Sequence, residues 1–242
     1  MIVNPLQNGW EIIFQRNHAL LAGAIALEMK QQFRPPHWPE TLSAIIDHDD
    51  GQSDWTQSEH LSKEGRPLDF TMHGLDMEQV RRVVDEANYK SQWIKMLVST
   101  HILSVYSSMD HKPRELETFL ADQKKKQKKL LRYFQLTKKE LMQYYAFLRW
   151  CDECSLILCQ QRLVNVSQRI EVGDLADGSS HFIYLKENNK LGVEPWCFES
   201  DQCCVSAEYH TIDQLSFSST DELRERVLKA KTKKRYWEFE KE

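Results

Sequence analysis

The sequence contains no long uninterrupted apolar segment. Its longest apolar run, residues 19–27, is broken by Gly23 and flanked by polar residues, whereas a membrane-spanning helix needs ~20 consecutive apolar residues. The first residues also lack the basic patch, apolar core and small-residue cleavage site of a signal peptide. We therefore expect a cytoplasmic protein with no membrane partner.

Several catalytic and ligand-binding motifs are also missing. The chain has neither a glycine-rich phosphate loop nor a Gly-x-Ser-x-Gly nucleophile elbow, which argues against nucleotide binding through such a loop and against serine hydrolysis. Cys151-x-x-Cys154 has the spacing of metal ligands, but no second pair completes a four-thiolate site. The six cysteines are expected to be mainly reduced core residues.

The charge balance gives no reason to expect a nucleic-acid partner. The net charge is −4, and at the basic run of residues 124–129 we expect the solvated face of a helix. With 242 residues, of which 41% are apolar, the chain can bury a sizeable core without disulfides.

Helical periodicity dominates the first two-thirds of the chain. Apolar residues recur at three- and four-residue spacing and predict helices over residues 15–32, 39–47, 76–107, 113–134 and 137–160. Thr137 and Glu140 have the spacing of a capping box at the start of the last of these helices. Residues 49–74 are rich in Asp, Ser, Gly and Pro and predict a long ordered loop that contributes to a substrate pocket.

The pattern changes after about residue 164. Short runs between turn signals predict strands over residues 169–172, 181–186, 192–198 and 204–211, then a helix over 221–230 and an edge strand over 235–239. We therefore expect a mainly α fold: an all-α helical bundle over residues 1–162 and a small antiparallel β appendage over 163–242, α+β overall. The appendage should hold no metal ligand, place His181 and His210 at its edge or surface, and leave a homodimer open.

Separate predicted helices each place a metal-binding group on or beside an apolar face. These groups are His18, His48 with Asp49, His101, and Asp152. Burying the carboxylate of Asp152 is costly unless a cation compensates it. Nitrogen and oxygen donors suit Mn²⁺, Fe²⁺, Co²⁺, Ni²⁺ or Zn²⁺ better than Ca²⁺. The sequence thus predicts one divalent transition metal held by His18, His48, Asp49 and Asp152.

Three short motifs carry a resemblance to a known family. They are Gln15-Arg-Asn-His18, the run from Ser43 to His48-Asp49-Asp-Gly51, and Trp150-Cys-Asp152-Glu-Cys-Ser155. In this order they resemble the HD-domain superfamily of metal-dependent phosphohydrolases, in a divergent bacterial branch. The resemblance covers roughly residues 10–160 and implies an HD-like helical domain.

The resemblance also implies an activity. We expect a hydrolase that attacks a small phosphorylated or nucleotide-like substrate through a metal-bound hydroxide. Asp49 and Asp50 are the expected catalytic carboxylates, and Asp50 would orient the water or act as general base. Substrate contacts are expected from Arg16, Lys90, His101 and Gln52, although Gln52 stands where members of the superfamily commonly carry Lys.

Two other functions stay open. One is a non-catalytic, metal-stabilised binding or sensor module. The other is a di-iron oxygenase of HD type, in which His101 would help to hold a second metal ion. His60 and His73 could also complete such a second site, but surface positions in the loop are the simpler interpretation of both.

Overall fold

The computed structural model describes residues 1–49, 60–166 and 168–242. Its α-helices are α1 (Gln15–Glu28), α2 (Trp38–Asp47), α3 (Met77–Lys90), α4 (Gln92–Ser107), α5 (Arg114–Tyr133), α6 (Lys138–Cys159) and α7 (Thr220–Lys229). Its strands are β1 (Ile2–Leu6), β2 (Gly9–Ile13), β3 (Arg169–Asp174), β4 (Ser180–Leu185), β5 (Leu191–Glu194), β6 (Gln202–Ile212) and β7 (Lys233–Glu240). Short 3₁₀ helices occupy Gln31–Phe33 and Phe70–Met72.

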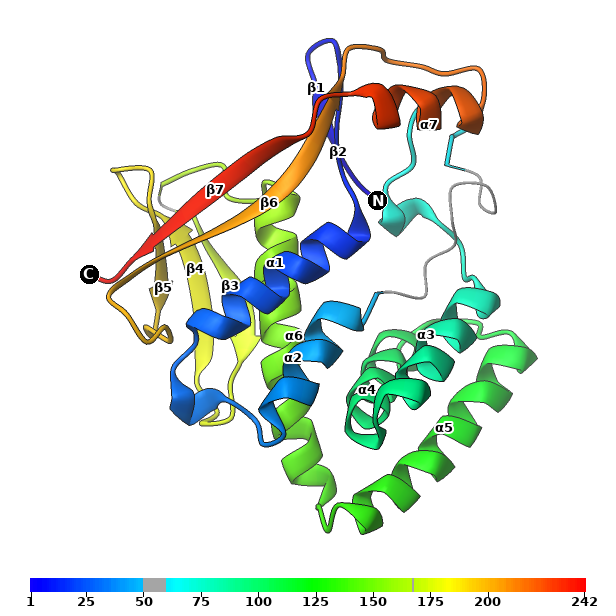
Figure 1. Cartoon of the computed structure of the whole chain (residues 1–242), viewed down its shortest axis with the longest axis vertical. Coiled ribbons are helices and arrows are strands. Elements are labelled where there is room, and N and C mark those ends of the chain that lie inside the picture. The colour runs from blue at the N-terminus through cyan, green and yellow to red at the C-terminus, as the bar shows by residue number, and fades with distance from the viewer. Residues whose placement is uncertain (50–59, 167) are drawn as a thin grey trace.

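All seven strands of the described chain belong to one sheet. Their order is β1-β2-β6-β7-β5-β4-β3, and neighbouring strands are antiparallel except for the parallel pair β5 and β7. The long strands β6 and β7 run across the molecule and join the N-terminal hairpin to the three strands β3, β4 and β5 (Figure 1). The sheet is therefore a major layer of the fold.

The prediction of a mainly α bundle with a small β appendage is wrong. Residues 1–13, expected to belong to an all-α region, form the hairpin of β1 and β2, and β2 pairs with β6. Asn8-Gly9 between two apolar runs is a hairpin signal. The hairpin could therefore have been predicted from the sequence, although it was not. Its pairing with β6, which enlarges the sheet, could not be predicted from this local signal. The division of the chain at residue 162 stays a prediction, although strands from both sides of it share this sheet.

The last strand also differs from its prediction. Residues 235–239 were expected at an edge, but β7 lies inside the sheet between β6 and β5. It pairs with β6 over eight residue pairs, from Gln202 with Glu240 to Tyr209 with Lys233. The alternating polar residues of β7 suggested an edge strand. A strand can, however, be hydrogen-bonded to neighbours on both sides while one of its faces stays exposed to solvent.

The long helix predicted over residues 76–107 is two helices. Ser91 has an extended backbone, with φ −161° and ψ 161°, and its hydroxyl accepts a hydrogen bond from the backbone N–H of Ile94. It thereby ends α3 and caps the start of α4. Apolar periodicity continues through the break because both helices face the same core, so periodicity alone did not locate it.

Other local predictions are confirmed. Thr137 and Glu140 form the expected capping box of α6, and α2, α5 and α7 match the predicted ranges within one residue at each end. The lysines at residues 124–129 are exposed on α5. All six cysteines are free, and four are buried. No helix in the described ranges is long and apolar enough to cross a membrane.

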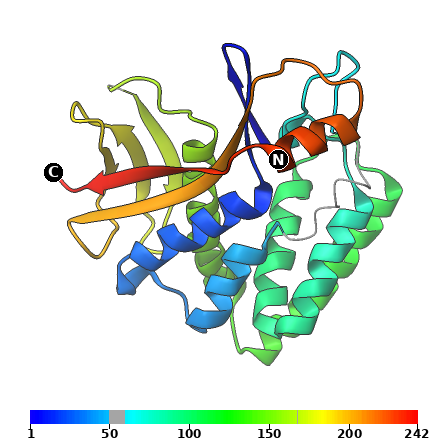
Figure 2. The same ribbon diagram turned by 45° about the horizontal axis from the view of Figure 1, so that its top comes forward.

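Helices α1 and α6 form the layer between the sheet and helices α2 to α5, whereas α7 contacts β6 directly. Helix α1 contacts β6, α2 and α6, whereas α6 contacts β3 and α4, and Figure 2 shows the sheet curling over this pair. At Gly23 of α1 an added Cβ would lie 2.6 Å from the side chain of Ile46 on α2. This close approach brings the beginning of α1 near the end of α2, where the candidate site lies.

Candidate metal centre

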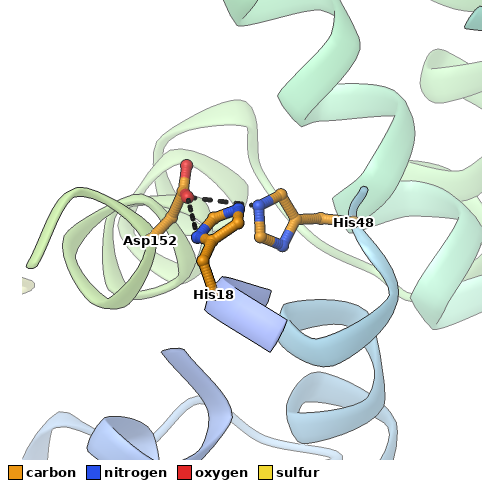
Figure 3. A group of neighbouring side chains, drawn as sticks. All are labelled: His18, His48 and Asp152. Atoms are coloured by element: carbon orange, nitrogen blue, oxygen red, sulfur yellow. Dashed lines mark hydrogen bonds and ion pairs between the residues drawn. The ribbon is translucent and has the colours of Figure 1, made fainter. Parts of the chain in front are cut away.

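Three helices bring the predicted metal-binding residues together. His18 comes from the first turns of α1, His48 caps the C-terminus of α2, and Asp152 lies in the middle of α6. Figure 3 shows the two imidazole rings and the Asp152 carboxylate converging from these helices. All three residues are buried, and Asp49 follows His48 at a partly exposed position.

The nitrogen and oxygen atoms of the cluster lie within contact distance. His48 Nε2 is 3.1 Å from Asp152 Oδ1, and His18 Nε2 is 2.8 Å from Asp49 Oδ2. His18 Nδ1 lies 3.9 Å from Asp152 Oδ1, and His48 Nε2 lies 3.7 Å from Asp49 Oδ2. One ligand atom from each of His18, His48 and Asp152 can be chosen so that all lie within 4.8 Å of one another. These buried groups could hold a metal ion.

Protein acceptors fix the orientation of both rings. His48 Nδ1 lies 2.6 Å from the carbonyl oxygen of Ile45, which only accepts, so Nδ1 donates. The Ser155 hydroxyl donates to the carbonyl of Asp152 and therefore accepts from His18 Nδ1 at 2.9 Å. Each ring thus turns Nε2 toward a carboxylate oxygen. That arrangement is favourable only when a proton or a metal ion lies between the two atoms.

The electrostatics of the metal-free cluster follow from burial and close opposite charges. Burial alone lowers the pKa of His48, but the charges of Asp49 and Asp152 and the contact with Asp152 raise it to about 10. Burial alone raises the pKa of Asp49 and of Asp152, but the charge of His48 holds both below their usual range. Without an ion, a proton on His48 therefore offsets one of the two carboxylate charges.

His101 of α4 adds a further nitrogen to the cluster. Its ring centroid lies 5.1 Å from that of His48, and His48, Asp49 and His101 form a second group with ligand atoms within 4.8 Å. His101 Nδ1 is 3.4 Å from the hydroxyl of Tyr145 on α6. Burial and the neighbouring charge of His48 lower the pKa of His101. The ring therefore stays neutral beside the cluster.

The cluster lies in the wall of a cavity of about 670 Å³. The described part of the predicted loop supplies His60, Phe70, His73 and Gly74 to this wall, and α3 and α4 supply Gln79, Val80, Val83, His101, Ile102, Val105 and Tyr106. Both histidines are only partly exposed, and their rings contact each other at a centroid distance of 5.8 Å. Both histidines therefore lie in the cavity wall as partly exposed residues of the predicted loop.

Of the predicted substrate contacts that the structure describes, one lines the cavity and two do not. His101 lines the cavity, whereas Arg16 and Lys90 are exposed and are not among the residues of its wall. Lys90 forms an ion pair with Asp47 at 2.9 Å. The expected catalytic residue Asp50 and the expected substrate contact Gln52 lie outside the described residues.

Two supporting residues were not assigned a role from the sequence. Ser155 orients His18, and Gln15 Nε2 donates to Asp49 Oδ2 at 3.3 Å. Each lies three residues from a predicted metal ligand on the same helix, so helical spacing was the available signal. His181 is corrected too: it is buried against Trp150 and Phe33, because β4 faces the helical layer. His210 is partly exposed beside Phe14.

The fold and the cluster define an α+β protein with a buried histidine–aspartate group that could hold a metal ion. A family model described as "Protein of unknown function (DUF3891)" matches residues 1–214, so the chain belongs to that family. The match includes every residue of the cluster. No curated protein matches the chain, and no solved structure matches it.

Proposed function

We propose that this protein is a hydrolase that depends on one divalent transition metal ion, Mn²⁺, Fe²⁺, Co²⁺, Ni²⁺ or Zn²⁺. The observation that carries the proposal is the orientation of His18 and His48. Each ring donates from Nδ1 to a protein acceptor and turns Nε2 toward a carboxylate oxygen. A shared cation stabilises this arrangement, and imidazole with carboxylate is a donor set that these metals prefer.

The surrounding residues support a reactive site over a purely structural one. The cluster borders a cavity, and Asp49 is partly exposed there, whereas structural metal sites are typically closed by four protein ligands. A bound ion of this class supplies a Lewis acid that acidifies water and polarises a substrate oxygen. Ser155 and Ile45 hold the two rings. We assign His101, whose lowered pKa keeps it neutral in the cavity wall, as the base that accepts and returns a proton beside them.

The geometry of His48 favours one ion over two. Both candidate groups include His48, and its Nδ1 is already used as a donor to Ile45. Only Nε2 remains, and it can bind one ion at a time. The described residues therefore do not favour the hypothesis of a di-iron oxygenase. The alternative to the hydrolase is the non-catalytic, metal-stabilised module.

The first test is metal content. Protein purified without chelator should contain about one ion per chain, and Asp152→Ala should lower the affinity at least about tenfold because a ligand is lost. Glu153→Ala is the matched control, since Glu153 lies on the same helix but pairs with Arg162 at the surface. Elemental analysis after dialysis against metal-free buffer measures both.

The second test is turnover. The metal-loaded protein should hydrolyse members of an ester, amide and phosphoester panel, lose this activity with chelator and regain it when the ion is restored. Folding of Asp152→Ala is checked by circular dichroism. Wild-type metal content in a folded Asp152→Ala protein would remove the cluster as the metal site. Bound metal without hydrolysis of any panel member would favour the non-catalytic module.

A further inference from the structure

The cavity beside the cluster has an unusual charge balance for a phosphate-binding site. Its described wall contains no Lys and no Arg, but it contains Asp76 in addition to Asp49 and Asp152. Phosphate groups in proteins are usually bound by Arg, Lys or open helix N-termini.

The other basic groups of the wall do not replace these cations. Burial, the Met1 amino group and the neighbouring His73 lower the pKa of His60 to about 4, and burial chiefly lowers the pKa of His73. Both rings are therefore neutral at pH 7. Burial also lowers the pKa of the Met1 amino group to about 6, so most of it is uncharged at that pH.

The helix ends at the cavity also disfavour an anion. The N-terminus of α3 borders the cavity, but Asp76 already accepts hydrogen bonds from the backbone N–H groups of Glu78 and Gln79. An anion would have to displace this carboxylate. The last turn of α4 contributes Val105 and Tyr106 to the wall, and the C-terminal end of a helix carries partial negative charge.

The remaining wall is largely apolar. Helices α3, α4 and α6 contribute Val80, Val83, Ile102 and Leu156, and the preceding loop contributes Phe70 and Leu75. A divalent ion would be balanced by the charges of Asp49 and Asp152, which leaves Asp76 as a net negative charge. The cavity therefore combines apolar surface with an excess of negative charge.

We propose that this cavity takes a small organic substrate with an apolar body and a neutral or positive charge, rather than a phosphomonoester. The proposal rests on the metal-dependent hydrolase proposed above and names its substrate class. It departs from the phosphorylated substrate that the sequence resemblance predicts. Hydrolysis of a neutral ester or amide needs no cation on the protein to neutralise the substrate before reaction.

The test uses the full chain loaded with Co²⁺ and three probes with the same metal-binding head. They are benzohydroxamic acids with a 4-aminomethyl, a 4-methyl or a 4-carboxy group, so the body of the probe is positive, neutral or negative on the same aromatic ring. The change in Co²⁺ visible absorption measures binding at pH 7.5. We expect the 4-carboxy probe to bind about tenfold more weakly than the other two, because one unit of like charge acts at short range.

Phenyl phosphate and inorganic phosphate are tested as competitors. Neither should displace the 4-methyl probe at concentrations near its dissociation constant. Tightest binding of the 4-carboxy probe, equal binding of all three probes, or displacement by phosphate would each overturn the proposal. Failure of the protein to bind Co²⁺ at all would instead contradict the metal-dependent function on which the proposal rests.

Two variants identify the charge responsible. Asp76→Asn removes the charge but keeps a side chain that caps α3, and it should improve binding of the 4-carboxy probe about threefold. Gln79→Lys adds a positive charge to the same wall and leaves Asp76 in place as the cap, and it should also improve binding of this probe. Asp85→Asn is the matched control, because Asp85 is exposed on α3 and is not part of the cavity wall. The same gain in Asp85→Asn, or no gain in either cavity variant, would overturn the assignment of the wall charge to Asp76.

Discussion

Histidines in and around the cavity differ in the charges that face them. His48 lies against Asp49 and Asp152, and these carboxylates raise its pKa to about 10 against the effect of burial. The pKa of His60 changes in the opposite direction, because burial, the Met1 amino group and His73 all lower it, to about 4. A fully buried ring is thus charged beside carboxylates, whereas a partly buried ring beside an amino group and a second histidine is neutral.

The lowered pKa of His60 predicts a pH dependence of stability. Between pH 6.5 and about 4 the unfolded chain binds a proton at His60 that the folded protein does not, so this contribution is present above pH 6.5 and is lost as the pH falls. His60→Asn should therefore lose less stability than the wild type between pH 7.5 and 5.0. Denaturant titrations at both pH values measure the difference.

The control for this effect is His111→Asn. His111 is exposed, so the variant should keep the pH dependence of the wild type. Parallel pH dependence of His60→Asn and the wild type would show that His60 titrates similarly in the folded and unfolded states, contrary to the expectation.

Among the elements, the helix break at Ser91 has the clearest local cause. The residue combines an extended backbone with a hydroxyl that accepts from the Ile94 N–H group. This break folds α4 back against α3, and α3 and α4 contact each other along their lengths. It thereby places His101 and the cavity wall of α3 on facing elements.

Loss of this cap should have a measurable cost. Ser91→Ala removes the acceptor for the first turn of α4 and should lower the free energy of unfolding by about 1 kcal/mol. Ser108→Ala, at the exposed other end of α4, should change it by less than about 0.5 kcal/mol. Chemical denaturation of both variants shows whether the loss of stability comes from the missing cap or from replacing any serine at an end of α4 by alanine. Equal stabilities would argue that solvent replaces the cap.

For the whole molecule, a buried carboxylate joins the two ends of the chain. Glu11 of β2 accepts from Arg235 of β7 through both guanidinium nitrogens, at 2.9 and 2.6 Å. Asn4 and Gln161 also donate to it, and only 2% of Glu11 is exposed. Strand β6 lies between β2 and β7, so the ion pair spans three strands.

Removing the arginine should destabilise the fold strongly. Arg235→Met leaves the Glu11 carboxylate buried without its cation, and we expect a loss of about 3 kcal/mol in the free energy of unfolding. The comparison is Arg169→Met, because Arg169 pairs with Glu194 between exposed side chains and should cost less than about 1 kcal/mol. A Glu11→Gln/Arg235→Met double variant that recovers part of the loss would identify the stranded charge as the cause. Equal costs for the two single variants would contradict it.

Local sequence was sufficient for much of the helical scaffold and for the candidate ligands. The capping box of α6 and the ranges of α2, α5 and α7 depend on contacts within a few residues. His18, His48 and Asp152 were identifiable because each puts a polar group on an apolar helix face, which needs a partner wherever the helix packs. Because each of these groups needs a polar partner, we expected them to lie together. In the structure, Asp152 Oδ1 lies 3.1 Å from His48 Nε2 and 3.9 Å from His18 Nδ1.

Only tertiary structure decided the extent of the sheet and the character of the cavity. The pairing of β2 with β6 and the interior position of β7 depend on partners about 200 and 30 residues apart, and local pattern carries no record of such partners. The charge of the cavity wall is likewise a property of residues gathered from separate helices and a loop. Sequence motifs predicted candidate metal ligands and a phosphorylated substrate. The surroundings of those candidate ligands, which decide what can lie beside an ion, exist only after the chain has folded.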